Sequence, residues 1–247
     1  MKIDQNAPPS GTVRDWLDAR VEAGGIAVTF PETGYDLSWS DLRTEADRTA
    51  RDLTAQGIAK GESVAIVHPN GVQGVKALYA VLYGGFRATM INLAAGPDAI
   101  AYALEHSEAR IAFVHDDQLE MFEKTRPDMM RLYTEGQERA PLHPLSPSDD
   151  ALLMYTSGTT GRPKGVVHTH SSLLAGGWTV TNAHKLGPQD RGLCVLPIYH
   201  INGLCVTVMG SLVSGGSLAM VSKFSASRFW AQCETGGATW FSVVPTI

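Results

Sequence analysis

Cysteine is scarce in this sequence, with three residues in 247 (Cys194, Cys205 and Cys233). Their odd number and wide spacing match neither a disulfide framework nor a cysteine metal site, so we interpret them as buried free thiols of a reducing compartment. The chain also lacks the apolar core of a secretory signal near its N-terminus and any apolar run long enough to cross a membrane. We therefore expect a cytoplasmic protein that has no membrane partner.

Charge is likewise sparse and slightly negative. Charged residues make up 18% of the chain, the formal net charge is −5, and no run of basic residues occurs. This balance excludes a nucleic-acid-binding role, which requires Lys and Arg to be concentrated on one surface. The hydrophobic content of 44% is that of an ordinary packed domain.

Short apolar segments alternate with amphipathic segments along the whole chain. Strands are expected over 26–30, 35–39, 63–67, 88–91, 111–114, 166–168, 192–196, 217–221 and 238–244. Helices are expected over 12–23, 40–56, 72–83, 97–106, 171–185, 203–213 and 225–235, with Thr12 and Ser40 starting the first two. The alternation predicts an α/β fold with doubly wound, mostly parallel sheets flanked by helices.

Residues 134–149 are rich in proline and charge. We interpret this segment as a surface connector. Two alternatives stay open: it is a long loop within one domain, or it marks a boundary between two subdomains.

The most distinctive stretch runs from 152 to 170. An apolar run (Leu152 to Tyr155) and a later β-branched pair (Val166, Val167) enclose a group without any carboxylate: Thr156, Ser157, Gly158, Thr159, Thr160, Gly161 and Lys164. Glycines let backbone N–H groups point into one concavity, hydroxyls donate further hydrogen bonds, and a lysine adds positive charge. The composition favours a loop that binds a polyanion such as a triphosphate, although a simple turn between two strands has a similar composition.

This loop does not fit the Walker pattern. That pattern requires Gly-Lys followed by Ser or Thr at the start of a helix, whereas Lys164 precedes Gly165 and a predicted strand. No helix N-terminus would then lie under the phosphates. The apolar flanks instead predict a hairpin with the loop at its tip, mobile until nucleotide binds.

The stretch from Tyr155 to Gly165 (Y-T-S-G-T-T-G-R-P-K-G) closely resembles the signature loop of the adenylate-forming enzymes. This superfamily contains the acyl- and aryl-CoA synthetases, the luciferases and the adenylation domains of peptide synthetases. Segments within 37–70 and 82–92 also resemble the opening motifs of the family, and we interpret them as packing signatures.

The resemblance implies ATP and Mg²⁺ as ligands of the loop. The residues that would hold the β- and γ-phosphates, with their backbone amides, are Thr156, Ser157, Gly158, Thr159, Thr160 and Gly161. Lys164 would balance the phosphate charge as a catalytic residue. The metal would be held by Thr156 or by no residue of this chain.

A second segment, Pro197 to Gly203 (P-I-Y-H-I-N-G), resembles the family motif in which an aromatic residue and a histidine line the carboxylate pocket. CoA synthetases carry this form, whereas amino-acid adenylation domains usually have Phe-Asp there. The resemblance implies that His200 orients the acyl carboxylate as a second catalytic residue. The pocket would be lined by Tyr199, His200, Asn202 and Gly203, with Trp178 and the 201–207 stretch as further candidates.

Two other histidines, His168 and His170, alternate along a predicted strand and suggest a metal pair. A third ligand is absent nearby in the sequence. We therefore interpret them as polar residues at a strand end.

The resemblance covers nearly all of the chain but about the first half of a family member. The magnesium-binding Thr-Glu pair, the ribose-binding aspartate, the hinge and the C-terminal lid domain with its catalytic lysine have no counterpart in the 247 residues. We therefore expect residues 1–247 to form an incomplete N-terminal AMP-binding (adenylation) domain that is inactive in isolation.

The implied parent activity is that of an acyl-CoA ligase, which forms an acyl-adenylate from ATP and a carboxylic acid and then a thioester with CoA. The first alternative is a non-catalytic nucleotide-binding or regulatory fragment. The second is a Walker-type NTPase, which would release phosphate without an acid substrate. The resemblance is also compatible with a homodimer.

Overall fold

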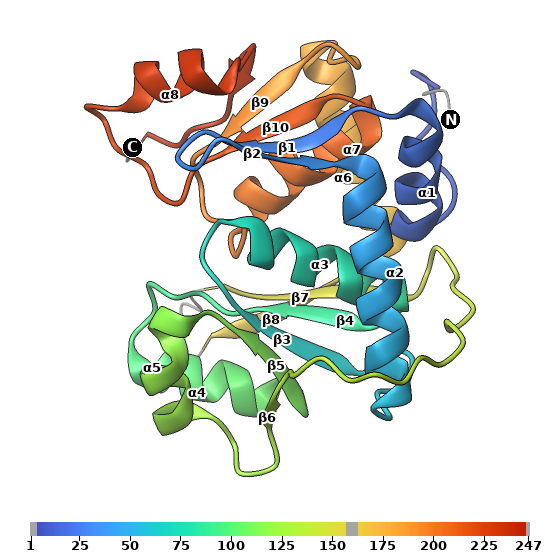
Figure 1. Cartoon of the computed structure of the whole chain (residues 1–247), viewed down its shortest axis with the longest axis vertical. Coiled ribbons are helices and arrows are strands. Elements are labelled where there is room, and N and C mark those ends of the chain that lie inside the picture. Colours follow the sequence, from blue (N-terminus) through green and yellow to red (C-terminus); the bar gives the residue numbers. More distant parts are fainter. Residues whose placement is uncertain (1–3, 157–162, 246–247) are drawn as a thin grey trace. The chain divides into compact units, whose positions relative to one another are not determined.

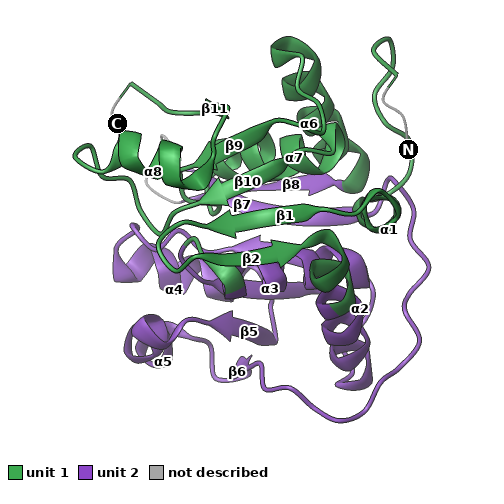
Figure 2. Cartoon of the chain, turned by 45° about the horizontal axis from the view of Figure 1, so that its top comes forward, with its two compact units in different colours: residues 1–44, 70–72, 170–247 green, residues 45–69, 73–169 purple. Residues whose placement is uncertain are grey.

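The computed structural model describes residues 4–156 and 163–245. Two compact units are distinguished in Figure 2. Unit 1 comprises Met1–Thr44, Asn70–Val72 and His170–Ile247, and unit 2 comprises Glu45–Pro69 and Gln73–Thr169. The connector 134–149 is irregular chain within unit 2.

The described part of unit 1 is built on a five-stranded sheet (Figure 1). Its order is β11-β9-β10-β1-β2, with bounds Trp240–Phe241, Arg191–Cys194, Ser217–Met220, Ile26–Phe30 and Tyr35–Ser38. The pairings are parallel except for the hairpin of β1 and β2. Helices α1 (Val13–Ala23), α6 (His170–His184) and α7 (Gly210–Ser214) contact one another, while α8 (Phe229–Gly236) packs on β9 and β10.

Helix α1 begins where the sequence predicts. Thr12 and Asp15 form a reciprocal capping box, which satisfies two backbone donors at the helix start. Its buried face includes one residue that periodicity does not reveal, Arg20, which is 6% exposed. The guanidinium donates to the carbonyl oxygens of Leu212 (2.7 Å) and Val213 (2.8 Å), so it satisfies carbonyls at the end of α7.

The described part of unit 2 is built on a six-stranded sheet (Figure 1). Its order is β6-β5-β3-β4-β7-β8, with bounds Arg131–Leu132, Ile111–Val114, Ser63–Val67, Arg87–Met90, Asp150–Thr156 and Lys164–Thr169. Only β8, at the edge, runs antiparallel to its neighbour. Every residue of β3 is buried, as expected for a central parallel strand.

Helices α3 (Val72–Gly84), α4 (Pro97–His106) and α5 (Leu119–Thr125) follow the strands of unit 2 in alternation. Side chains of α4 and α5, such as Leu104 and Phe122, form one buried cluster with Ala65 of β3 and Ala112 of β5. The predicted fold class, mostly parallel sheets flanked by helices, is confirmed.

Several predicted bounds are wrong by a few residues. Helix α2 (Trp39–Ala55) begins at Trp39 and not at Ser40, because the Ser38 hydroxyl accepts from the Asp41 amide (3.0 Å) and acts as the cap. The helix predicted over 225–235 begins only at Phe229 and ends at Gly236. The strand predicted over 238–244 is limited to Trp240–Phe241.

Three elements were missed and one was assigned the wrong type. The missed elements are a 3-10 helix over Asp116–Gln118, α5 and β6. The predicted α-helix over 203–213 is a π-helix over Asn202–Met209 that continues into α7. π-Helical turns are uncommon and are frequently found at functional sites.

The cysteines are all free, as predicted. Only Cys194 is fully buried, and burial raises its pKa to about 11. Cys205 and Cys233 are half-buried, so the interpretation of all three as buried thiols is wrong for these two.

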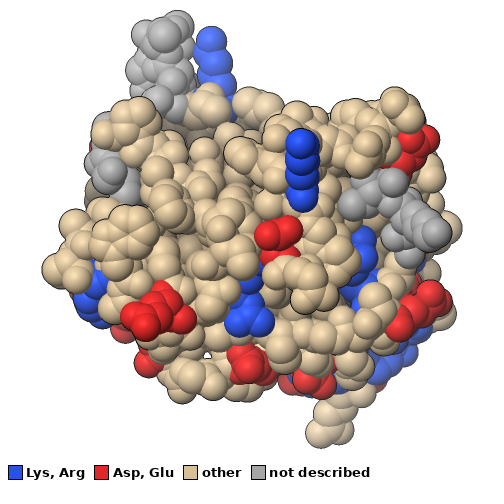
Figure 3. Space-filling model, turned by 90° about the horizontal axis from the view of Figure 1, so that it is seen from above, with Lys and Arg blue, Asp and Glu red and all other residues tan. Residues whose placement is uncertain are grey.

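Among the described residues, no helix is both long and apolar enough to cross a membrane. On the face drawn in Figure 3, Lys and Arg side chains lie scattered among Asp, Glu and uncharged residues.

Candidate active site

The phosphate-loop candidate lies at the tip of the β7–β8 hairpin in unit 2. The antiparallel register pairs Thr156 with Lys164 and Tyr155 with Gly165, so the two ends of the loop are neighbours. Thr156 and Lys164 are both exposed at this tip. The residue after Lys164 continues a strand, as predicted, and therefore no helix starts there.

The central candidates of the loop, Ser157, Gly158, Thr159, Thr160 and Gly161, lie outside the described residues. The same holds for the predicted mobility of the loop tip. The structure thus places the two flanks of the motif, Thr156 and Lys164.

An aromatic group supports the base of this hairpin. The Tyr155 hydroxyl lies 3.0 Å from His106 Nδ1 at the end of α4, and the Tyr102 ring stacks on the His106 ring at 5.3 Å. Burial, and secondarily the Tyr102 phenol, raises the pKa of Tyr155 to about 12, so its hydroxyl keeps its proton at neutral pH. A Cβ on Gly165 would lie 3.0 Å from Leu153 Cδ1, so a larger residue there would require the Leu153 side chain to shift.

The second candidate segment lies in unit 1, between β9 and the π-helix. The Pro197 carbonyl accepts from the His200 amide (3.0 Å), and the His200 carbonyl accepts from the Leu204 amide (3.0 Å). A Cβ on Gly203 would lie 2.3 Å from the Pro197 oxygen, which explains the glycine at this position. The segment is therefore a tight turn that leads directly into the π-helix.

Within this turn the Tyr199 and His200 rings meet edge to face, with their centroids 5.0 Å apart. His200 is exposed, but partial burial still lowers the pKa of its imidazole. Burial also raises the pKa of the Tyr199 phenol. The neutral imidazole offers one donor and one acceptor to a polar ligand, and the protonated phenol beside it offers a further donor.

The other pocket candidates have defined partners. Asn202 Oδ1 accepts from the Ser242 hydroxyl (2.9 Å), which adds a polar group that sequence reasoning missed. The Trp178 indole donates to the Asp4 carbonyl oxygen (2.7 Å). The structure places Tyr199, His200, Asn202 and Gly203 on one continuous stretch of unit 1, and Thr156 and Lys164 in unit 2.

His168 lies in β8, as expected for a polar strand residue, but His170 does not. His170 is the fully buried first residue of α6, where its Nδ1 accepts from the Val13 amide (3.3 Å). Over residues 4–156 and 163–245, no group of three or more His, Cys, Asp or Glu side chains is arranged to hold a metal ion.

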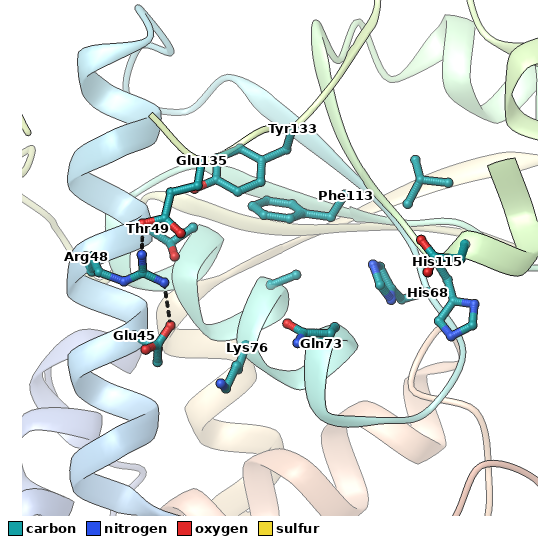
Figure 4. Close-up of a pocket in the computed structure, with 13 residues that line it drawn as sticks. Glu45, Arg48, Thr49, His68, Gln73, Lys76, Phe113, His115, Tyr133 and Glu135 are labelled. Carbon is teal, nitrogen blue, oxygen red and sulfur yellow. Dashed lines mark hydrogen bonds and ion pairs between the residues drawn. The ribbon is translucent and has the colours of Figure 1, made fainter. Parts of the chain in front are cut away.

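A further polar cavity of about 370 Å³ lies in unit 2 and was missed from the sequence (Figure 4). Arg48 lies between Glu45 and Glu135 at one side, and Figure 4 shows His68 beside His115 at the other. Burial, and then the neighbouring His115, lowers the pKa of His68 to about 4. The only sequence signal for this site is a histidine directly after an apolar strand.

Comparison with known proteins gives consistent matches. A model of the family described as AMP-binding enzyme matches residues 17–247. The chain is 40% identical over 233 residues to a sulfoacetate–CoA ligase of Cupriavidus necator, covering 88% of this chain and 46% of the relative. It is 30% identical over 241 residues to a 2-succinylbenzoate–CoA ligase of Bacillus licheniformis, covering 94% of this chain and 50% of that relative.

Among solved structures, the inhibitor-bound N-terminal domain of FACL13 from Mycobacterium tuberculosis superposes with a TM-score of 0.86 and 26% identity. This match covers 95% of the present chain and 63% of that chain. The present chain spans about half the length of the curated relatives it matches.

Proposed function

The chain belongs to the AMP-binding enzyme family, and we propose that residues 1–247 form the N-terminal AMP-binding portion of a carboxylate–CoA ligase. The observation that supports this most directly is the hairpin of β7 and β8, which brings Thr156 and Lys164 to the two ends of the signature loop. The named relatives, which are CoA ligases for sulfoacetate and 2-succinylbenzoate, support the same reaction class.

In the proposed reaction a carboxylate oxygen attacks the α-phosphorus of ATP, and the bond to the pyrophosphate leaving group breaks. The CoA thiol then attacks the acyl carbonyl and releases AMP. The protein contributes mainly by positioning the reactants and by stabilising charge.

We assign the β- and γ-phosphates to the loop residues Thr156, Ser157, Gly158, Thr159, Thr160 and Gly161 with their amides. Lys164 balances phosphate charge as an exposed cation at the loop's end. The Tyr199–His200 turn receives the acyl carboxylate, and the Asn202–Ser242 pair adds a polar group beside it.

A Mg²⁺ ion would accompany the phosphates of ATP, since it binds proteins mainly through one or two carboxylates and substrate phosphates. The described residues contain no converging group of acidic or histidine ligands. Thr156, at the end of β7, is the residue of this chain that we propose as a ligand of the metal, or no residue of this chain holds it.

We place the activity in the cytoplasm because the three free cysteines fit a reducing compartment. The proposal also includes a homodimer, which size-exclusion chromatography with light scattering tests.

The function is tested on the longer protein that contains residues 1–247, by ATP–pyrophosphate exchange with a panel of acids: sulfoacetate, 2-succinylbenzoate, oxalate and a long-chain fatty acid. The proposal expects exchange that depends on one of these acids. Nucleotide binding without any exchange favours the alternative of a non-catalytic nucleotide-binding fragment. Phosphate release without an acid favours a Walker-type NTPase.

The role of Lys164 is tested in the same assay with Lys164→Ala. A unit charge about 4 Å from a phosphate oxygen contributes roughly 1–4 kcal/mol at effective dielectric constants of about 80 to 20. We therefore expect the KM for ATP to rise about tenfold or more and adenylation to slow. Lys124→Ala, which removes an exposed i,i+4 ion pair with Glu120 in the same unit, is the control and leaves both constants unchanged. Unaltered exchange by Lys164→Ala would show that the assigned role is wrong.

A further inference from the structure

Asn70 is a buried amide that bonds to three distant backbone groups. It is 5% exposed and belongs to unit 1, like all of its partners. Its Oδ1 accepts from the Ile198 amide (2.9 Å), and its Nδ2 donates to the carbonyl oxygens of Leu196 (3.0 Å) and Val221 (3.2 Å). The side chain therefore uses three of its four hydrogen-bonding positions.

These partners lie where two parallel strands stop pairing. The last register pair of β9 and β10 is Cys194 with Met220. Beyond this pair Leu196, Ile198 and Val221 stay buried, at 6%, 0% and 0% exposure. Buried peptide groups require partners, and Asn70 supplies them in place of the sheet ladder.

The next residues after Ile198 are Tyr199 and His200. With the chain fixed through Leu196 and Ile198 on one side, and by the contact of Gly203 with the Pro197 oxygen on the other, the turn has little freedom to move. The spatial positions of both side chains thus depend on a residue more than 120 positions earlier in the sequence.

We propose that Asn70 is a positioning residue for the Tyr199–His200 turn, acting through its hydrogen bonds to Leu196, Ile198 and Val221. We call this set of contacts the Asn70 clamp. The inference rests on the proposed function only where it names a carboxylic acid as the ligand of the turn.

The chemistry of the clamp requires an amide. Aspartate at this position would keep an acceptor for the Ile198 amide but would place a carboxylate oxygen against two carbonyl oxygens. Alanine would remove all three bonds and leave the buried Ile198 amide and Val221 carbonyl without the Asn70 partner, while the Leu196 carbonyl would keep only the Cys194 thiol at 3.5 Å. The two substitutions therefore separate the bond to Ile198 from the bonds to the strand ends.

The experiment compares Asn70→Asp, Asn70→Ala and a control, Thr181→Val, by NMR amide exchange of the chain and by pyrophosphate exchange of the longer protein that contains it. Thr181 is a buried residue of the same unit whose hydroxyl donates to the Gly177 carbonyl (2.8 Å), away from the clamp. Its valine variant removes one buried hydrogen bond at nearly constant shape.

We expect the Ile198 amide to exchange at least tenfold faster in Asn70→Ala and to stay protected in Asn70→Asp and Thr181→Val. In both Asn70 variants the KM for the acid rises about tenfold, while the KM for ATP changes less than twofold. Unchanged Ile198 protection in Asn70→Ala overturns the clamp, as does an equal rise of both KM values, which a general loss of structure would cause.

If Asn70→Ala does not fold, Asn70→Asp decides alone: a selective rise of the acid KM supports the proposal and unaltered kinetics overturn it. A lack of pyrophosphate exchange by the unsubstituted longer protein counts against the proposed function only. The Ile198 amide then still decides whether the clamp exists.

Discussion

Asp52 of α2 should be the residue that holds the start of the 134–149 connector. Its carboxylate is 1% exposed, and Oδ2 accepts from the Tyr133 hydroxyl (2.7 Å), the Gln56 amide (3.0 Å) and the Gly136 backbone N–H (3.1 Å). Arg139 lies 3.6 Å from the other oxygen. Burial, and secondarily the bond to Asp52, raises the pKa of Tyr133, so this phenol remains a donor.

The expected cost follows from these contacts. Hydrogen bonds to a charged group contribute roughly 1.5–3 kcal/mol each, but the donors around Asp52 are only partly buried and regain some water contact. We therefore expect Asp52→Ala to lower the free energy of unfolding by about 3 kcal/mol, which corresponds to a fall of roughly 6–12 °C in Tm for a chain of this size. Asp52→Asn keeps an acceptor oxygen and should lower the free energy of unfolding by about 1 kcal/mol.

Urea unfolding measures the stability, and trypsin cleavage after Arg139 reports the connector itself. Asp52→Ala should accelerate this cleavage more strongly than Asp52→Asn. Asp47→Ala on the same helix is the control, because the Asp47–Arg51 pair is an ordinary surface ion pair. If the free energies of unfolding of Asp52→Ala and Asp47→Ala differ by less than about 0.5 kcal/mol, and Asp52→Ala leaves the cleavage rate unchanged, the role given to the Asp52 carboxylate is refuted.

Three further outcomes follow from the structure. The pKa of His68 in the folded protein is about 4, below its ordinary 6.5, so His68 binds a proton more readily in the unfolded chain. The free energy of unfolding should therefore fall as the pH drops from 6.5 towards 4. The urea midpoints at pH 7 and pH 5 should differ less in His68→Gln than in the unsubstituted protein. Gly136→Ala places a Cβ 2.7 Å from Asp52 Oδ1, so it should lower the free energy of unfolding by about 1–2 kcal/mol and accelerate trypsin cleavage of the connector. Unchanged stability and cleavage would mean that the chain shifts freely at this position. A thiol reagent should modify the half-buried Cys233 well before the fully buried Cys194, as mass spectrometry would show, and the reverse order would contradict the described burial.

Local signals in the sequence predicted many of the elements. The Thr12 cap lies next to its helix in the chain, and the apolar run at 63–67 is buried from end to end, so each was visible within a few residues. The flanks of the phosphate hairpin were predicted in the same way, since the runs on both sides of Thr156 and Lys164 favour strands.

The failures concern features that depend on distant parts of the chain. Helix α5 (Leu119–Thr125) has only seven residues and is held by the burial of Phe122, which no local pattern reveals. The π-helical form of Asn202–Met209 is also not encoded by a period of hydrophobic residues.

The same limit applies to the candidate site. The family resemblance identified Tyr199 and His200, but the partner that holds their turn is Asn70, separated from Ile198 by 128 positions. Its role arises only when β9 and β10 end side by side. Likewise, the histidine pair His68 and His115 meets only because two strands of one sheet end near each other.

The guanidinium of Arg20 sets a limit on how the polypeptide can be shortened for expression. A start site after α1 would delete the donor for the Leu212 and Val213 carbonyls, which lie almost two hundred positions later, directly beyond the π-helix. Trimming only as far as residue 9 would retain the Thr12 cap and the whole of α1. A shortened protein that begins beyond Arg20 should therefore lose structure around Leu212 and Val213 of α7, far from the new N-terminus in the sequence.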